Sequence, residues 1–205
     1  MNKNKNFYNK NIGLTKRRNM KIGILGGSFN PAHKGHLYIS NIALKLLQLD
    51  EIWWLVSPQN PLKHSFIKNS IKERVYAARK ISKGYKIRVE DLESRFNTNL
   101  TAKTLKILLE RYRGTRFIWL MGADNLNEMN KWFSWKNIFN TMPIAVFDRG
   151  VYSYSIINSI AGKRYFSNLH KRKNSTSIFN TPLPSWKFIH NSKNPLSSTN
   201  IRKLN

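Results

Sequence analysis

Two histidines lie three residues apart, directly after a glycine-rich turn near the start of the chain. The segment reads GGSFNPAHKGH over residues 26–36, between the apolar runs 22–25 and 37–49. Glycines let backbone N–H groups approach a phosphate closely, and the N-terminus of the next helix offers further donors and a positive dipole end. Because side chains three residues apart on a helix point the same way, the pattern predicts a phosphate site that His33 and His36 face.

Other phosphate-binding and metal-binding patterns fit the segment less well. Its glycine spacing differs from the dinucleotide fingerprint G-x-G-x-x-G, and the chain has no G-x-x-x-x-G-K-[ST] loop. The chain also has no cysteine, and its other histidines, His64, His170 and His190, are scattered without the spacing of metal ligands. The sequence therefore disfavours a dehydrogenase, a P-loop kinase and a metal pair. A structural turn with two partly exposed histidines is the plain alternative.

A second segment suited to phosphate lies near the other end of the chain, where residues 196–202 read LSSTNIR. The hydroxyls of Ser198 and Thr199 can hold phosphate oxygens together with the N–H groups of a helix start. Arg202, about one turn further on, could add a bidentate contact. Taken by itself, a capped helix with a surface arginine explains this segment better.

A third segment, residues 120–126 (LMGADNL), follows an apolar run. Gly122 and Asp124 then come just after a predicted strand, where open α/β sheets place their ligands. Asp124 could accept hydrogen bonds from ribose hydroxyls, or it could cap the next helix. Trp132 could stack on an aromatic ring, although a single tryptophan more often packs in a core or on a surface.

The elements that position these residues alternate between strand and helix. Apolar runs bounded by turn residues predict strands at 21–25, 51–56, 86–89, 115–121, 144–147 and 186–190. Helical periodicity predicts helices at 35–48, 70–82 and 99–113, the second with a serine cap. This alternation predicts an α/β fold, a Rossmann-like, doubly wound parallel sheet with helices on both faces.

A chain of 205 residues is expected to form one domain. We expect residues 1–19, which are basic and free of acids, to be a disordered extension before a domain at 20–205. Within that domain we expect 150–185 to be a loop-rich insertion, since only isolated apolar residues occur there. No apolar run is long enough to span a bilayer, and the absence of cysteine fits a reducing compartment such as the cytoplasm.

The net charge of +26 is the main argument for a different function, because a charge of that size is typical of proteins that bind nucleic acids. The basic residues are spread along the whole chain, however, and no nucleic-acid motif occurs. A positive field would also steer small anionic substrates. Nucleic-acid binding therefore ranks second, as an incidental property or as the alternative function of a basic protein on this fold.

Together the three segments resemble the nicotinate-nucleotide adenylyltransferases, a branch of the nucleotidyltransferases. Residues 26–36 match the glycine turn and His-x-x-His signature of that superfamily, and 197–202 match its second signature, Ser-Ser-Thr-x-Ile-Arg. The branch also carries Gly-x-Asp followed by a tryptophan, and a threonine before the preceding helix, which fits Thr101. The resemblance covers 21–202. The chain departs from it at Leu100, where relatives often have an aromatic residue, in the additional residues 1–19, and in ending three residues after Arg202.

The resemblance implies a reaction that joins nicotinate mononucleotide and ATP to give deamido-NAD and pyrophosphate. It assigns His33 and His36 to catalysis on the triphosphate, and Thr101 and Trp132 to the nicotinate nucleotide. It also implies Mg²⁺ held mainly by the ATP phosphates, with no dedicated protein metal site. The implied ATP contacts are Gly26, Gly27, Ser28, Phe29, Gly122, Asp124, Ser198, Thr199 and Arg202.

Two substrates compete with nicotinate mononucleotide within this class. Pantetheine-phosphate adenylyltransferases share both phosphate signatures, although they are usually shorter and lack the Gly-x-Asp…Trp segment. Nicotinamide mononucleotide is the other alternative, since the residues that would select acid over amide are the weakest part of the resemblance. Thr101 could equally be an ordinary N-cap of its helix.

Overall fold

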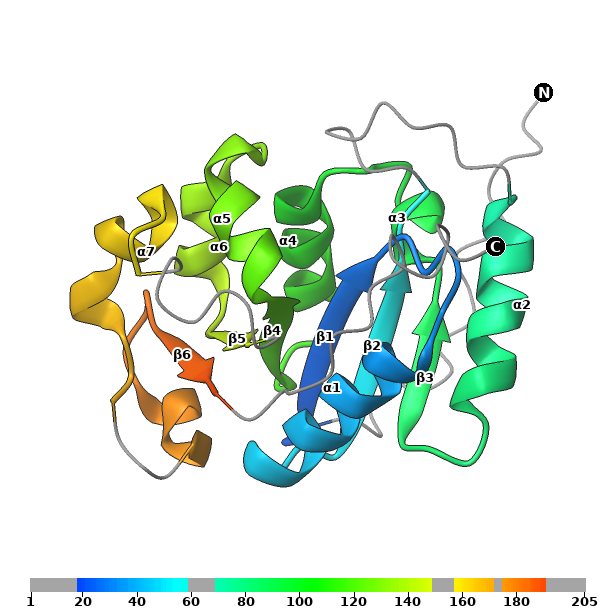
Figure 1. The fold of residues 1–205 in the computed structure, drawn as a ribbon, viewed down its shortest axis with the longest axis horizontal. Helices are drawn as coiled ribbons and strands as arrows, with labels where there is room; N and C mark the ends of the chain where they lie inside the picture. The colour runs from blue at the N-terminus through cyan, green and yellow to red at the C-terminus, as the bar shows by residue number, and fades with distance from the viewer. Residues whose placement is uncertain (1–17, 59–68, 149–156, 172–174, 191–205) are drawn as a thin grey trace.

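The computed structural model describes residues 18–58, 69–148, 157–171 and 175–190 (Figure 1). In these ranges six parallel strands form one sheet in the order β3-β2-β1-β4-β5-β6. The strands are β1 (Lys21–Gly27), β2 (Glu51–Val56), β3 (Ile87–Glu90), β4 (Arg116–Gly122), β5 (Ile144–Phe147) and β6 (Trp186–Ile189). All six agree with the predicted strands to within two residues at each end, and the predicted fold class is confirmed.

The sheet is covered on both faces, because its strands are apolar on both sides. Neighbours Trp53 and Trp54 in β2 are both fully buried, yet they belong to different core clusters. One cluster includes Phe117 and Leu105 and lies under α4, whereas the other includes Ile39 and Ala43 of α1, the helix in front of the sheet in Figure 1. Continuous burial of this kind is what a parallel sheet between two helical layers requires.

The longer helices follow the sequence prediction closely. They are α1 (Lys34–Leu46), α2 (Ile71–Ser82) and α4 (Thr101–Arg111). At the start of α2, the Ser70 hydroxyl accepts from the Glu73 N–H while the Glu73 carboxylate accepts from the Ser70 N–H. This capping box satisfies two backbone donors reciprocally, so the predicted serine cap is confirmed.

Several shorter elements were not predicted, because three to seven residues are too few to show a helical period. They are α3 (Leu92–Arg95), α5 (Ala123–Glu128), η2 (Met129–Lys131) and α6 (Trp135–Thr141). Within the expected insertion 150–185, the described parts form α7 (Ile160–Arg164), η3 (Phe166–Asn168) and η4 (Ser175–Asn180). Of the expected extension, Arg18 and Asn19 form a turn, and the Asn19 N–H donates to the Gly114 carbonyl at 2.8 Å.

The order of the strands decides where a ligand can bind. The chain passes from β1 to β2 and β3 on one side of the sheet, and then returns to place β4, β5 and β6 on the other side. The carboxyl ends of β1 and β4 are therefore neighbours whose following loops diverge. In open parallel sheets this switch point forms the ligand crevice. Among the described helices, none is long and apolar enough to cross a membrane.

Close approach at the end of β1 gives a stability prediction. A Cβ atom on Gly26 would lie 2.4 Å from Cη2 of Trp119, whereas one on Gly27 would meet nothing closer than 3.5 Å, at the Phe29 ring. Gly26→Ala should therefore lower the free energy of unfolding by about 1–3 kcal/mol through overpacking. Gly27→Ala, the matched control, should stay within about 0.5 kcal/mol. Urea unfolding measures both, and equal losses would contradict this account of the packing.

Candidate active site

The glycine turn ends in a residue with a constrained backbone. After β1, Phe29 adopts a left-handed conformation with φ of 46°, which is uncommon for a residue with a side chain. Its ring is fully buried, stacks on Trp54 with centroids 5.0 Å apart and lies 4.6 Å from the His36 ring. The buried aromatic ring thus anchors a turn whose backbone would not adopt this shape unaided.

The two predicted histidines lie side by side at the start of α1, with ring centroids 3.8 Å apart. His33 is the N-cap of the helix rather than part of it, and its Nδ1 accepts from the Gly35 N–H at 3.1 Å. Nδ1 of His36 accepts in turn from the His33 N–H at 3.2 Å. The pair therefore forms a capping box in which imidazoles take the place of the usual hydroxyl and carboxylate.

This cap fixes which ring nitrogen of each histidine carries a proton. A nitrogen that accepts a hydrogen bond from a backbone N–H is unprotonated, so each neutral ring carries its proton on Nε2. Both side chains are also buried, with exposed fractions of 6% and 9%. The capping box thus makes the Nε2–H groups the ring donors of the pair, and a phosphate oxygen is a suitable acceptor for them.

The core also holds His36 in place. The Trp54 ring lies 5.8 Å from the His36 ring, and the Trp54 indole N–H donates to the buried Ser40 hydroxyl at 2.8 Å. Ser40 belongs to α1, one turn beyond His36. Helix α1 and strand β2 therefore fix the imidazole from two sides, and a side chain held in this way suits precise positioning of a ligand.

The predicted Gly-x-Asp residues lie on the neighbouring strand. Gly122 ends β4 and is the N-cap of α5, and Asp124 is in the first turn of that helix. Because Leu25 pairs with Leu120 in the β1–β4 register, Gly122 follows at the same edge as the glycine turn. Asp124 as a whole is half-buried, and the Oδ1 atom of its carboxylate is buried. The structure thus places these two segments at the same edge of the sheet.

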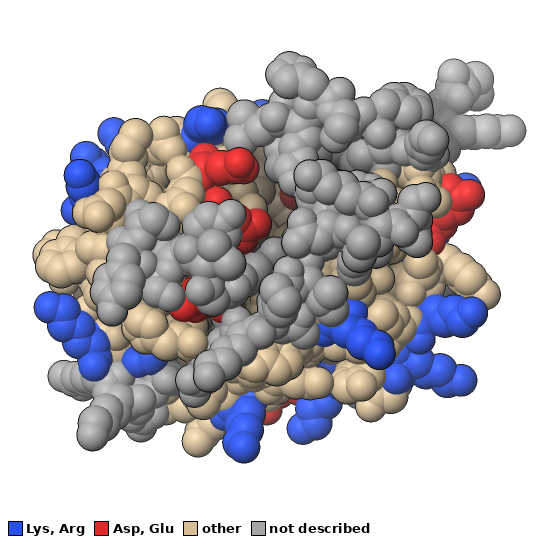
Figure 2. Space-filling model, viewed as in Figure 1, with Lys and Arg blue, Asp and Glu red and all other residues tan. Residues whose placement is uncertain are grey.

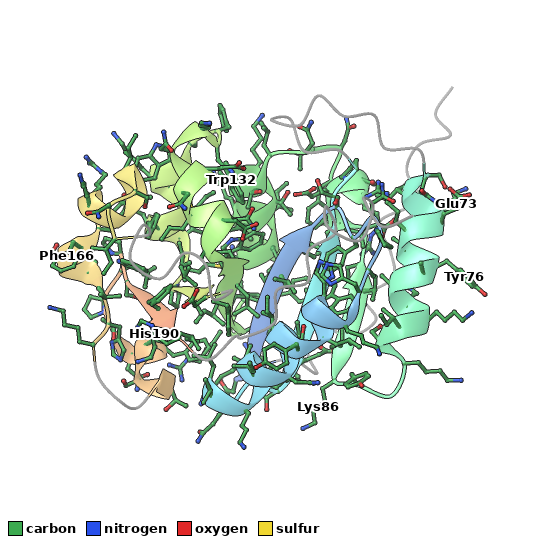
Figure 3. All side chains as sticks on the ribbon, viewed as in Figure 1. Glu73, Tyr76, Lys86, Trp132, Phe166 and His190 are labelled. Atoms are coloured by element: carbon green, nitrogen blue, oxygen red, sulfur yellow. The ribbon has the colours of Figure 1, made fainter. Side chains whose placement is uncertain are left out.

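Thr101 and Trp132 come from two elements on the same side of the sheet. Thr101 is the first residue of α4, and Leu100, not Thr101, is the N-cap. The alternative that Thr101 is an ordinary cap is thus wrong, and Leu100 makes no side-chain bond to the first turn. Nearby, Lys103 Nζ lies 5.7 Å from the centre of the Phe133 ring. The neighbouring Trp132 is half-buried and packs against the core cluster that lies under α4 (Figure 3).

Two buried charged residues at the same edge were missed by sequence reasoning. Arg74 of α2 is 3% exposed and donates to the Ser28 carbonyl at 2.6 Å. Glu93 of α3 is 5% exposed and is hydrogen-bonded to the Ser57 side chain. Burial raises the pKa of Glu93, and the bond from Ser57 lowers it in part. Arg74 lies on the buried face of α2 beside Val75, but its acceptors are main-chain carbonyls, which leave no signal in the sequence.

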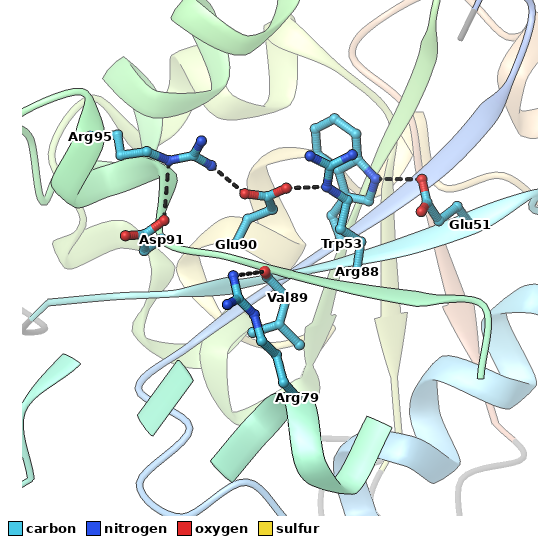
Figure 4. A network of polar contacts seen from close by, with 8 residues as sticks. All are labelled: Glu51, Trp53, Arg79, Arg88, Val89, Glu90, Asp91 and Arg95. Carbon is cyan, nitrogen blue, oxygen red and sulfur yellow. Dashed lines mark hydrogen bonds and ion pairs between the residues drawn. The ribbon is translucent and has the colours of Figure 1, made fainter. Parts of the chain in front are cut away.

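Ion pairs fix the short helix that carries Glu93 (Figure 4). The buried carboxylate of Glu90, the last residue of β3, is paired with Arg88 and Arg95. Arg95 also pairs with Asp91 at 3.1 Å. Helix α3 is therefore tied back to the end of β3, although four residues could not form a stable helix by themselves.

The charges on the described surface are unevenly distributed. All ten acidic residues of the chain lie in the described ranges, and five of them, Glu90, Asp91, Glu93, Asp124 and Asp148, end or closely follow strands β3, β4 and β5. On the face in Figure 2, lysine and arginine lie mainly around the periphery, whereas acidic side chains lie in part nearer the centre and in part at the right-hand edge. The large positive charge of the chain is therefore not gathered at this edge of the sheet within the described residues.

Some predicted residues lie outside the described residues. These are the residues of the second phosphate segment, with Ser198, Thr199 and Arg202. The glycine turn, both histidines, Gly122, Asp124, Thr101 and Trp132 all lie within the described ranges, at the carboxyl ends of the strands or on the elements that follow them.

Comparison with known proteins places this arrangement in a family. A family model described as cytidylyltransferase-like matches residues 24–204. A probable nicotinate-nucleotide adenylyltransferase of Methylorubrum extorquens is 39% identical over 89% of this chain and 99% of its own length. A protein of the same description from Bradyrhizobium sp. (strain ORS 278) is 41% identical over 89% of this chain and 95% of its own.

A solved structure has the same fold. The nicotinic acid mononucleotide adenylyltransferase of Plasmodium falciparum, complexed with NaAD, superposes with a TM-score of 0.69 over 90% of this chain and 83% of its own. Its sequence is 22% identical, so this likeness concerns the fold. The parallel sheet and its flanking helices are shared across that sequence distance.

The burial of Glu93 gives a prediction for stability as a function of pH. A carboxyl whose pKa is raised by folding binds its proton more tightly in the folded state, so the wild type loses stability as pH rises from the ordinary value of 4.5 through the raised pKa. Glu93→Gln removes that titration. The variant should therefore gain stability relative to the wild type between about pH 5 and pH 8, measured by urea unfolding.

The matched control is Glu110→Gln, which changes an exposed carboxylate on α4. Its stability relative to the wild type should stay the same across that range. If the stability difference between Glu93→Gln and the wild type is constant or shrinks as pH rises, burial does not raise the pKa of this carboxyl.

Proposed function

The chain belongs to the nicotinate-nucleotide adenylyltransferase family within the cytidylyltransferase-like proteins, and we propose that it joins nicotinate mononucleotide and ATP to give deamido-NAD and pyrophosphate. One observation of the site carries this proposal. Nδ1 of His33 and of His36 accepts from a backbone N–H, which leaves Nε2–H as the donor of each neutral ring for a phosphate. In the proposed reaction, the triphosphate of ATP supplies such a phosphate.

The chemistry needs positioning more than acid–base catalysis. The 5′-phosphate of nicotinate mononucleotide attacks the α-phosphorus of ATP in line. A new P–O bond forms, the bond from the α-phosphorus to the bridging oxygen breaks, and pyrophosphate leaves with that electron pair. Because the attacking phosphate is already ionised, no strong base is needed. Alignment and stabilisation of charge on the transferring group then supply the rate enhancement.

The two histidines and the glycine turn act on the triphosphate. His36 is nearest the reacting α-phosphate and His33 binds beside it, each through Nε2. The main chain of Gly26, Gly27, Ser28 and Phe29 completes this cradle, which the start of α1 favours for an anion. The buried, tightly packed rings support this role, because a held donor needs little reorganisation during the reaction.

The remaining residues select the two nucleotides. Gly122 and Asp124 bind ATP, and the Asp124 carboxylate accepts from ribose hydroxyls. Thr101 and the adjacent N–H groups at the start of α4 bind the nicotinate carboxylate, while Trp132 stacks on the pyridine ring. The N-cap residue Leu100 makes no side-chain hydrogen bond to the N–H groups in the first turn of α4. This supports the proposed role of these N–H groups, because the N-cap side chain does not occupy them.

Mg²⁺ bound to the ATP phosphates would supply charge neutralisation for the leaving pyrophosphate. Among the described residues, no group of three or more histidine or carboxylate side chains is arranged to hold a metal. Mg²⁺ commonly keeps several waters and binds substrate phosphates, so the ATP phosphates would supply its ligands here. Ser198, Thr199 and Arg202 hold the β- and γ-phosphates in this scheme, an assignment that rests on the sequence. We place the reaction in the cytoplasm, where ATP is available.

An acceptor assay tests the proposed function. The protein is incubated with ATP, Mg²⁺ and one acceptor, and pyrophosphate release is measured. We expect rapid release with nicotinate mononucleotide, slower release with nicotinamide mononucleotide and little with phosphopantetheine. His36→Ala, purified identically, should release pyrophosphate roughly 10²–10³-fold more slowly. Such a loss would show that the activity does not come from a contaminating enzyme. No release with any acceptor, together with tight RNA binding, would favour the nucleic-acid alternative instead.

Trp132 is the residue whose loss should affect one substrate only. Trp132→Ala removes the stacking surface and should raise KM for nicotinate mononucleotide by about 10-fold or more, while KM for ATP changes little. Phe133→Ala is the matched control, because Phe133 is the next residue and is 56% exposed. Steady-state kinetics with each substrate varied in turn decides the matter, and equal changes in both KM values would argue against stacking.

A further inference from the structure

Arg74 is a buried cation on an otherwise apolar helix face. It lies in the first turn of α2 beside the buried residues Val75 and Ala78, and only 3% of it is exposed. Burying a charged group is unfavourable unless its hydrogen-bonding groups are satisfied. The hydrogen-bond partners of its guanidinium therefore indicate the role of Arg74.

The guanidinium donates to four main-chain carbonyls at the carboxyl edge of the sheet. Nη1 donates to Ser28 at 2.6 Å and to Ser57 at 2.7 Å, and Nη2 donates to Pro58 at 2.9 Å. Nε donates to Asn69, just before α2, at 3.2 Å. One side chain thus connects the loop after β1 with the loop after β2. A planar fork with several fixed donors can do this, whereas the single ammonium of a lysine cannot.

The bond to Ser28 also sets the direction of a proposed phosphate donor. The Ser28 carbonyl and the Phe29 N–H belong to one peptide unit, and in a trans peptide these two groups point in opposite directions. A carbonyl drawn toward Arg74 therefore turns the Phe29 N–H to the other side of the turn. That N–H is one of the main-chain groups assigned to the triphosphate.

The same peptide unit is under strain. Phe29 has φ of 46°, and rotating the Ser28–Phe29 peptide is the local way for this backbone to leave the left-handed region. The buried Phe29 ring, stacked on Trp54, keeps the side chain where it is. Without the bond from Arg74, the peptide could rotate and turn the N–H away from the phosphate while the ring stayed in the core.

We propose that Arg74 is a positioning residue for adenylyl transfer, which holds the Ser28–Phe29 peptide so that the Phe29 N–H faces the triphosphate of ATP. This inference rests on the proposed function of the glycine turn. Arg74 acts through the backbone of the turn and does not itself contact the substrate. Its loss should therefore affect the use of ATP and leave the binding of the pyridine nucleotide almost unchanged.

The test uses Arg74→Lys, which keeps the charge, and Arg74→Ala. We expect kcat/KM for ATP to fall by roughly 10²-fold in both, as for loss of one preorganised donor, while KM for nicotinate mononucleotide stays within about threefold. Arg79→Lys and Arg79→Ala are the matched controls, because Arg79 is an exposed arginine on the same helix with one bond of 3.4 Å, to the Val89 carbonyl. Both controls should keep wild-type kinetics.

Chemical rescue separates positioning from general loss of structure. Guanidinium ion at millimolar concentration should restore several-fold activity with ATP to Arg74→Ala and should not affect the Arg79 variants. If Arg74→Ala does not fold, Arg74→Lys tests the proposal by itself, through the fall in kcat/KM for ATP compared with the KM for nicotinate mononucleotide. Wild-type kinetics in Arg74→Lys, or equal losses for both substrates, would overturn the proposal.

A binding measurement distinguishes failure of this inference from failure of the proposed function. If the wild type releases no pyrophosphate with nicotinate mononucleotide, calorimetry with a non-hydrolysable ATP analogue replaces kinetics. Arg74→Lys should then weaken binding of the analogue by at least about 10-fold, and Arg79→Lys should not. Binding by Arg74→Lys as tight as that of the wild type would show that Arg74 does not position the turn.

Discussion

The hydrogen bonds between β1 and β4 determine where everything else in this molecule lies. These two strands are neighbours in the sheet although β2 and β3 come between them in the chain, and their register runs from Lys21 opposite Arg116 to Leu25 opposite Leu120. Both strands then end in glycine at the same edge. The glycine turn and the Gly122–Asp124 segment lie close together at one edge of the sheet only because this register is kept. A shift by one residue would turn every side chain of the strand to the other face of the sheet.

The site is an extension of the hydrophobic core rather than a set of surface loops. Phe29 and Trp54 are fully buried, and the His36 ring packs against both. The same imidazole closes the cap of α1. Packing, capping and the proposed binding of phosphate therefore depend on the same few side chains, and the groups proposed to contact phosphate are held in place by the core and the cap. This preorganisation suits a reaction in which alignment supplies most of the rate.

Much of the fold and part of the site could be predicted from the sequence. The run from Glu51 to Val56 and the capped helix after Ser70 have strong local patterns, and the structure places both where they were expected. Local patterns could not reveal that His33 is a cap, or that Leu100 and not Thr101 precedes α4 as its N-cap. These depend on backbone angles set by tertiary contacts. Arg74 shows the same limit, because its four acceptors are carbonyls from three separate segments and carbonyls carry no sequence signal.

The bonds of Arg74 have a mechanical consequence for the edge of the sheet. Ser28 lies after β1, and Ser57 and Pro58 lie after β2, yet all three carbonyls meet the same guanidinium. The two loops cannot separate without breaking at least one of these bonds, so a displacement of one loop is transmitted to the other. A nucleotide that presses on the glycine turn would therefore displace the beginning of the second loop without touching it, because the Arg74 side chain and the bond from the Ser57 N–H to the Gly27 carbonyl both join the two segments.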